Sequence, residues 1–247
     1  SLGFCEGWRQ TSNKLVLSCA VEDCPALSGN TGKRQSSYWY SEAVRVADLE
    51  ITEEIARRAV ARTVSKIGAR KPRTCEAPVV FDPFTTREFL KKVSKAARGE
   101  NIYRKSSFLV DRALAPVGSP LVTIVDDGLI PAKLGTRPFD AEGVRTRRTV
   151  VFDRGVLKSY LCGAYAGRKI GLSTTGNAGG ITNFCLAGGG SSPAEIIASV
   201  DRGLYVTSIS GPGANYMTGD FSQGAQGFWI ENGELSHPVD EFTIASS

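Results

Sequence analysis

The fold is decided by Gly227-Phe228-Trp229-Ile230-Glu231-Asn232-Gly233-Glu234-Leu235, a stretch close to the end of the chain. Aromatic and β-branched residues, which favour strands, lead into Asn232-Gly233. This dipeptide is the one that best tolerates the positive φ angles of a type I′ turn. The stretch therefore predicts a β-hairpin.

Most of the remaining chain has the same character. A second hairpin is expected from segments 149–152 and 156–161, which are joined by Asp153-Arg154-Gly155. Five further strands are predicted at 14–21, 37–49, 78–81, 121–125 and 204–209. Because strands follow strands, the pattern predicts an α+β fold that is mostly antiparallel β-sheet, a barrel-like domain.

Three surface helices are predicted beside these strands. The first begins at Thr52 and has apolar residues at three-to-four spacing as far as Gly68. The second begins with Thr85 and Glu88 in capping-box spacing and runs to Gly99. The third begins with a capping box at Ser192, is expected to bury Ile196, Ile197 and Val200, and ends before Gly203. Segments 126–146 and 176–192 are expected to be irregular.

Composition narrows the function classes. The chain has 247 residues, of which 41% are hydrophobic and 22% charged, enough to bury a sizeable core. The net charge of +5 does not require a polyanionic partner. No apolar run approaches the roughly 18 residues of a membrane helix, so we expect no membrane association. No repeat or clear linker divides the chain, which is therefore treated as one domain.

Few residues are suited to metal binding or catalysis. His237 is the single histidine of the sequence, so no multi-histidine site can form, and a surface or strand-end role is expected for it. The six cysteines contain no C-x-x-C pair; we expect buried free thiols, although their even number also allows disulfides. Phosphate-binding glycine motifs are absent as well.

The carboxylates are better candidates for cation binding or acid/base catalysis than histidine or cysteine. Asp126-Asp127 ends an expected strand, while Asp140, Glu142 and Asp220 lie among glycines. Such a set could bind Ca²⁺ or Mg²⁺, or act as an acid/base pair. Turn capping and ion pairing with nearby arginines explain the same pattern. Spacing leaves both interpretations open, with the structural one favoured.

The second predicted helix has a basic face. Arg87, Lys91, Lys95 and Arg98 recur at helical spacing and share one side. The face could follow the phosphates of a nucleic acid. A solvated outer face is favoured, because no stacking aromatic residues alternate with these cations.

From Cys5 onward the chain closely resembles the TldD/PmbA family, and within it the PmbA (TldE) branch. The order and spacing of the matching segments make the resemblance specific. These segments are Tyr103-Arg104-Lys105-Ser106-Ser107-Phe108-Leu109, Pro138-Phe139-Asp140-Ala141-Glu142-Gly143-Val144, Ala166-Gly167-Arg168-Lys169-Ile170-Gly171, Thr175-Gly176-Asn177-Ala178-Gly179-Gly180, Thr218-Gly219-Asp220-Phe221-Ser222, 227–234 and Thr243-Ile244-Ala245.

The resemblance implies a cytoplasmic zinc metallopeptidase in which a TldD-type and a PmbA-type subunit associate and cleave short, unstructured peptides. In the TldD-type subunit a helix carries the metal-binding H-E-x-x-x-H, and the matching positions here are Leu90, Lys91 and Lys95. Leucine has no donor atom and an ammonium group has no lone pair. The family's further cysteine ligand falls beyond Ser247. The resemblance therefore predicts no catalytic residue and no metal or other cofactor in this chain, with the zinc in its partner.

Family members are much longer, so residues 1–247 are expected to be a single C-terminal-type domain that lacks an N-terminal α/β domain and the final strands. Its expected roles are dimerisation, with a TldD-type subunit or with a second copy, and peptide holding. Glycine-rich loops can bind an extended peptide by strand addition. The candidate peptide-holding residues are Gly176, Asn177, Gly179, Gly180, Thr218, Gly219 and Asp220.

Other interpretations of the sequence remain open. The glycine-rich loops could simply be conformationally demanding turns. The whole protein could also be a non-enzymatic, homodimeric peptide-binding protein. Nucleic-acid binding through the basic helix is the least favoured alternative.

Overall fold

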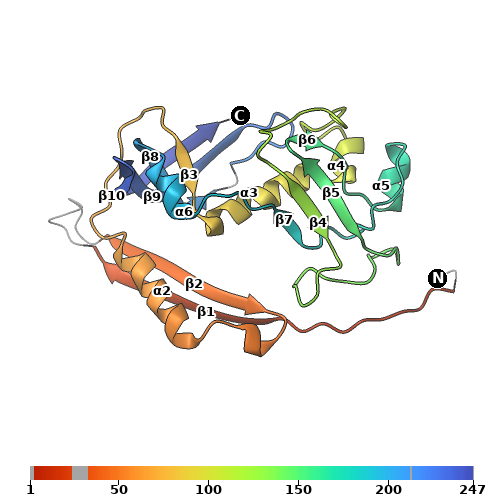
Figure 1. The fold of residues 1–247 in the computed structure, drawn as a ribbon, viewed down its shortest axis with the longest axis horizontal. Coiled ribbons are helices and arrows are strands. Elements are labelled where there is room, and N and C mark those ends of the chain that lie inside the picture. The colour runs from red at the N-terminus through yellow and green to blue at the C-terminus, as the bar shows by residue number, and fades with distance from the viewer. Residues whose placement is uncertain (1–2, 24–32, 212, 247) are drawn as a thin grey trace.

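Three sheets organise the molecule (Figure 1), which we describe from a computed structural model over residues 3–23, 33–211 and 213–246. The strands are β1 (Asn13–Glu22), β2 (Arg34–Ala43), β3 (Val79–Phe81), β4 (Ile124–Asp127), β5 (Arg148–Asp153), β6 (Val156–Leu157), β7 (Phe184–Leu186), β8 (Arg202–Ser210), β9 (Phe221–Glu231) and β10 (Glu234–Ser246). The helices are η1 (Val46–Asp48), α2 (Thr52–Val64), α3 (Pro83–Ala96), α4 (Gly99–Tyr103), α5 (Ala164–Lys169) and α6 (Pro193–Ala198).

The hairpin predicted at Asn232-Gly233 is confirmed. Asn232 has φ 52° and Gly233 has φ 77°, and β9 and β10 pair antiparallel on either side of them. The sheet has the order β10-β9-β8-β3, in which only β3 runs parallel to its neighbour. Leu204, Val206 and Trp229 are buried in the core of this sheet.

The second sheet has the order β6-β5-β4-β7 and is antiparallel throughout. Its predicted tight turn is present, with positive φ at Arg154 and Gly155. Buried Val151 and Leu157 pack there with Ala97 and Ile102 from the α3–α4 region. Strand β7 lies within segment 176–192, which we expected to be wholly irregular; that expectation was wrong, because β7 pairs with β4 despite its glycine-rich surroundings.

The third sheet is a two-stranded ribbon. Strands β1 and β2 pair over ten residues each, and α2 packs on them. Helix α2 turns Ile55, Ala59 and Thr63 inward, as the three-to-four spacing predicts. Figure 1 shows this ribbon and α2 beside the other two sheets, with α3 running between those two.

Helix α3 starts two residues earlier than predicted. The side chain of Asp82 caps it by accepting a hydrogen bond from the Thr85 backbone N–H at 2.5 Å, and Pro83 occupies the first turn. The predicted Thr85–Glu88 capping box was therefore wrong. An aspartate directly before a proline is a stronger start signal than a threonine inside the first turn.

Helix α6 has the predicted capping box between Ser192 and Glu195. The helix stops at Ala198 and has no buried residue, and Ile196 is 41% exposed. The expected burial of its apolar side was therefore wrong. Helices α4 and α5, of five and six residues, are too short to give a periodic pattern and were not predicted.

The prediction of an α+β fold with mostly antiparallel sheets is confirmed, and the sheets of the described residues stay open rather than closing into a barrel. The single-domain assignment remains a prediction. Within the described ranges, none of the helices has both the length and the apolar character needed to cross a membrane. Five cysteines are free but only Cys162 is buried, which corrects the expectation of generally buried thiols; Cys24 lies outside the described residues.

Candidate functional site

A pocket lies between the basic face of α3 and the glycine-rich loop. Lys91, Lys95 and Arg98 line it on the helix side, and Gly179 and Gly180 line it on the loop side. Its volume is about 440 Å³, and its other lining residues are Glu88, Lys92, Ser94, Ile181 and Tyr216. We call it the α3–glycine pocket. The pocket brings together the basic face of α3 and one of the glycine-rich loops, which were separate candidates in the sequence.

The loop backbone at this pocket is available for binding. Gly179 is exposed with φ 89°, and in the described chain neither its N–H nor its C=O has a hydrogen-bond partner. Gly180 is held in place, since its carbonyl accepts a 2.7 Å hydrogen bond from Arg137 Nη2. An unpaired backbone donor and acceptor beside a pocket are the groups that strand addition uses.

The other predicted residues lie outside the pocket lining. Asn177 is buried, and its Nδ2 donates to Asp126 Oδ2 at 2.6 Å. Gly176 is buried against the backbone of Arg145. Thr218, Gly219 and Asp220 form a turn in which the Thr218 hydroxyl donates to Asp220 Oδ2 at 2.6 Å. Only nearby Tyr216 contributes to the pocket from that segment.

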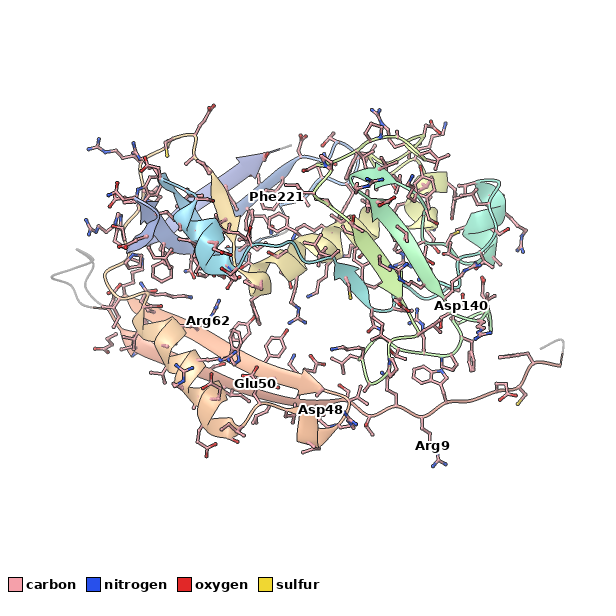
Figure 2. The ribbon with its side chains drawn as sticks, in the orientation of Figure 1. Arg9, Asp48, Glu50, Arg62, Asp140 and Phe221 are labelled. Atoms are coloured by element: carbon pink, nitrogen blue, oxygen red, sulfur yellow. The ribbon has the colours of Figure 1, made fainter. Side chains whose placement is uncertain are left out.

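Two buried aspartates shape the glycine-rich loop. Asp126 Oδ1 accepts from the Thr182 N–H at 2.8 Å, and Asp140 Oδ2 accepts from the Ala178 N–H at 2.9 Å. Burial raises the pKa of Asp126, against the effect of its hydrogen bonds. Asp140, labelled in Figure 2, also accepts from two N–H groups of its own turn. These contacts support the turn-capping interpretation of the carboxylates over the cation-binding one.

The α3 positions that the family resemblance aligns with a metal site carry side chains that do not fit a metal. Lys91 points to solvent, with a 62% exposed side chain, and its Nζ lies 2.7 Å from Glu88 Oε1. Leu90 and Lys95 offer no carboxylate, imidazole or thiolate. Across residues 3–23, 33–211 and 213–246, no three His, Cys, Asp or Glu side chains are grouped so that they could hold an ion.

A second and larger cavity was not predicted. It lies between the β1–β2 ribbon and strands β8 and β9, with α2 and α3 beside it, and has a volume of about 640 Å³. Arg62 of α2, labelled in Figure 2, reaches across to the Asp82 carboxylate and the Thr207 carbonyl. We call this cavity the ribbon groove. No sequence signal identifies it, because its walls come from six separate elements.

Comparison with known proteins places the chain in a family. Residues 74–247 match the model of the PmbA/TldA metallopeptidase C-terminal domain. The chain is 36% identical to Metalloprotease PmbA of Escherichia coli O157:H7, across all of this chain and 53% of that protein. It is 29% identical to a Metalloprotease TldD homolog of Haemophilus influenzae, across 95% of this chain and 51% of that protein.

A solved structure has the same fold. It is a Bacteroides thetaiotaomicron protein, named as a candidate modulator of DNA gyrase, with a TM-score of 0.91 and 31% identity over 99% of this chain and 54% of that one. The chain thus spans about half the length of the relatives it matches. It belongs to the PmbA/TldD metallopeptidase family, as a PmbA-type member represented by its C-terminal domain.

Proposed function

We propose that this chain is the peptide-holding part of a PmbA-type subunit that carries no catalytic metal, and that a TldD-type partner supplies the zinc. The proposal is carried by the identity of the side chains on one face of α3. Leu90, Lys91 and Lys95 stand where metal ligands are expected, and both lysines line the α3–glycine pocket. Cations in these positions repel a divalent ion, whereas they attract the carboxylates of a peptide.

Peptide holding also fits the other wall of the pocket. An unfolded peptide presents N–H and C=O groups, which the unpaired backbone groups of Gly179 can pair. Tyr216 adds an aromatic surface for side chains of the peptide. Backbone pairing gives little sequence preference, as expected of a subunit that handles varied unstructured peptides in the cytoplasm.

The test is to mix the full-length protein with a TldD-type partner. Zinc content and cleavage of an unstructured peptide are measured for each protein alone and for the pair. We expect the pair to cleave and this protein alone to be inactive with little zinc. Zinc-dependent cleavage by this protein alone would overturn the proposal. Peptide binding by a homodimer, without any gain of cleavage on mixing, would favour the non-enzymatic alternative.

A matched pair of variants tests the role of the pocket. Lys95→Gln removes a lining charge, and Lys158→Gln removes the charge of an exposed lysine outside the pocket. We expect Lys95→Gln to weaken peptide binding and Lys158→Gln to leave it unchanged. Equal effects of the two variants would mean that only the overall charge matters.

A further inference from the structure

The ribbon groove contains buried polar atoms that lack partners. The Thr85 hydroxyl and Gln223 Oε1 have no hydrogen bond within the described residues, although Thr85 is only 2% and Gln223 only 4% exposed. Both residues line the groove. Buried polar groups in proteins are nearly always paired, so two orphans on one wall point to a bound group that pairs them.

The identity of these atoms restricts the ligand. Gln223 Nε2 donates to the carbonyls of Ser210 and Gly211, which fixes the orientation of the amide and leaves Oε1 as the orphan. Oε1 can only accept a hydrogen bond, so the ligand must carry an N–H or O–H donor. The Thr85 hydroxyl can donate to an acceptor on the same ligand. A peptide backbone supplies both groups, whereas the dianion of a phosphate monoester supplies only acceptors.

The charges in the groove restrict the ligand further. Lys66 and Lys92 both line it and are partly buried. Among the described residues no carboxylate lies within ion-pair distance of either ammonium group, although Glu88 attracts that of Lys92 from farther away. Lys66 Nζ donates only to neutral acceptors, the Ser36 carbonyl at 2.9 Å and Gln226 Oε1 at 3.1 Å. Burial lowers the pKa of both lysines because it disfavours their charged form. A bound carboxylate would stabilise that charged form. Among the described residues, Glu88 is the one acidic residue that lines the groove.

The groove also adjoins the first site. Glu88 and Lys92 line the ribbon groove on one side and the α3–glycine pocket on the other. One extended peptide that crosses α3 at these two residues can therefore occupy both cavities. The groove volume of about 640 Å³ accommodates several peptide residues.

We propose that the ribbon groove binds an acidic, extended segment of the peptide that the α3–glycine pocket holds. A backbone N–H pairs with Gln223 Oε1, a carbonyl pairs with the Thr85 hydroxyl, and a carboxylate lies near Lys66 and Lys92. The inference rests on the proposed function in that the ligand is a peptide. It adds a second binding site and a preference for acidic sequences.

The experiment measures binding of two fluorescent ten-residue peptides to the full-length protein by anisotropy. One peptide contains Asp and Glu, and the other contains Asn and Gln at the same positions. The test variants are Thr85→Val, which removes an unpartnered hydroxyl at nearly constant shape, and Lys66→Gln. We expect Thr85→Val to weaken binding of both peptides about fivefold, as the loss of one hydrogen bond predicts. We expect Lys66→Gln to reduce the preference for the acidic peptide.

Matched controls separate binding from folding. Thr86→Val removes a hydroxyl that donates to the Asp82 carbonyl at 2.9 Å and does not line the groove. It should lower stability without changing peptide binding, whereas Thr85→Val should change binding and leave the thermal midpoint nearly unaltered.

The outcomes distinguish failure of the groove site from failure of the proposed function. Wild-type affinities in both Thr85→Val and Lys66→Gln would overturn the groove site, and the proposed function would survive if Lys95→Gln still weakens binding. If no variant affects binding, or if neither peptide binds, both proposals fail. Inorganic phosphate that binds the protein but is not displaced by the acidic peptide would also overturn the groove assignment.

Discussion

Arg62 Nη1 lies 3.0 Å from Asp82 Oδ2, and this ion pair ties α2 and its β-ribbon to the start of α3. Asp82 is almost fully buried and also caps α3 through its other oxygen. The second terminal nitrogen of Arg62 donates to the carbonyl of Thr207 in β8. One arginine thus connects three elements at the edge of the ribbon groove.

Arg62→Met is expected to lower the free energy of unfolding by about 2 kcal/mol, because it leaves the Asp82 carboxylate buried without its cation. Asp82→Asn keeps an oxygen for the helix cap, and the more exposed arginine keeps its hydrogen bond to the Thr207 carbonyl, so its cost should be smaller. Urea denaturation of both variants and of the double variant gives the coupling energy. A coupling energy near zero, or a larger loss for Asp82→Asn, would contradict this view of the pair.

The raised pKa of Asp126 fixes the sign of its contribution to the pH dependence of the unfolding free energy. Its pKa is raised in the folded state, so the folded protein keeps this proton to a higher pH than the unfolded chain does. The stabilising contribution of Asp126 is complete below about pH 4, the unfolded pKa, and is lost as the pH rises through the folded pKa. The unfolding free energy of the wild type minus that of Asp126→Asn should therefore fall as the pH increases across this window.

The comparison variant for that series is Asp126→Ala. Asn177 Oδ1 has no partner in the described structure, so a rotated Asn177 amide can pair with the new amide in Asp126→Asn. Asp126→Ala removes the acceptor of the Thr182 N–H and the shorter of the two hydrogen bonds of Asn177 Nδ2, and should cost about 2 kcal/mol more at neutral pH. A pH-independent difference between wild type and Asp126→Asn, or equal stabilities of the two variants, would count against this assignment.

Two glycines with similar φ angles predict different substitution costs. Gly171 has φ 73° with no atom within 4 Å of an added Cβ, whereas Gly176 has φ 76° and its Cβ would lie 2.7 Å from the Arg145 carbonyl oxygen. Gly171→Ala should cost about 1 kcal/mol, the ordinary penalty for a left-handed backbone. Gly176→Ala should cost at least twice as much, measured by thermal unfolding. Similar costs would show that the loop moves freely away from Arg145.

The sequence predicts elements well where one local signal dominates. The Asn232-Gly233 turn and the Ser192–Glu195 capping box each depend on a few adjacent residues, and both are present. The start of α3 was misplaced because two local signals compete, and the Asp82 cap before proline prevails. Strand β7 was missed because its pairing with β4 is a tertiary contact that composition does not reveal.

Part of the candidate site could likewise be predicted from the sequence, and part could not. The helical spacing that places Lys91 and Lys95 on one face of α3 is visible in the sequence, as is the glycine content of the facing loop. Their meeting in one pocket is not visible, because it depends on the buried Asp126 and Asp140 contacts that hold the loop. The ribbon groove, including Thr85 and Gln223, required the three-dimensional arrangement.

The proposed function requires that this chain lack the side chains to hold a hydrolytic zinc ion, and among the described residues no suitable group of ligands is present. The most direct test is to assemble the full-length protein with a TldD-type partner, separate the two subunits under native conditions and measure zinc in each by mass spectrometry. We expect the zinc to remain with the TldD-type subunit and to be far below one ion per chain in this one. Close to one tightly bound zinc ion per chain of this subunit would contradict it.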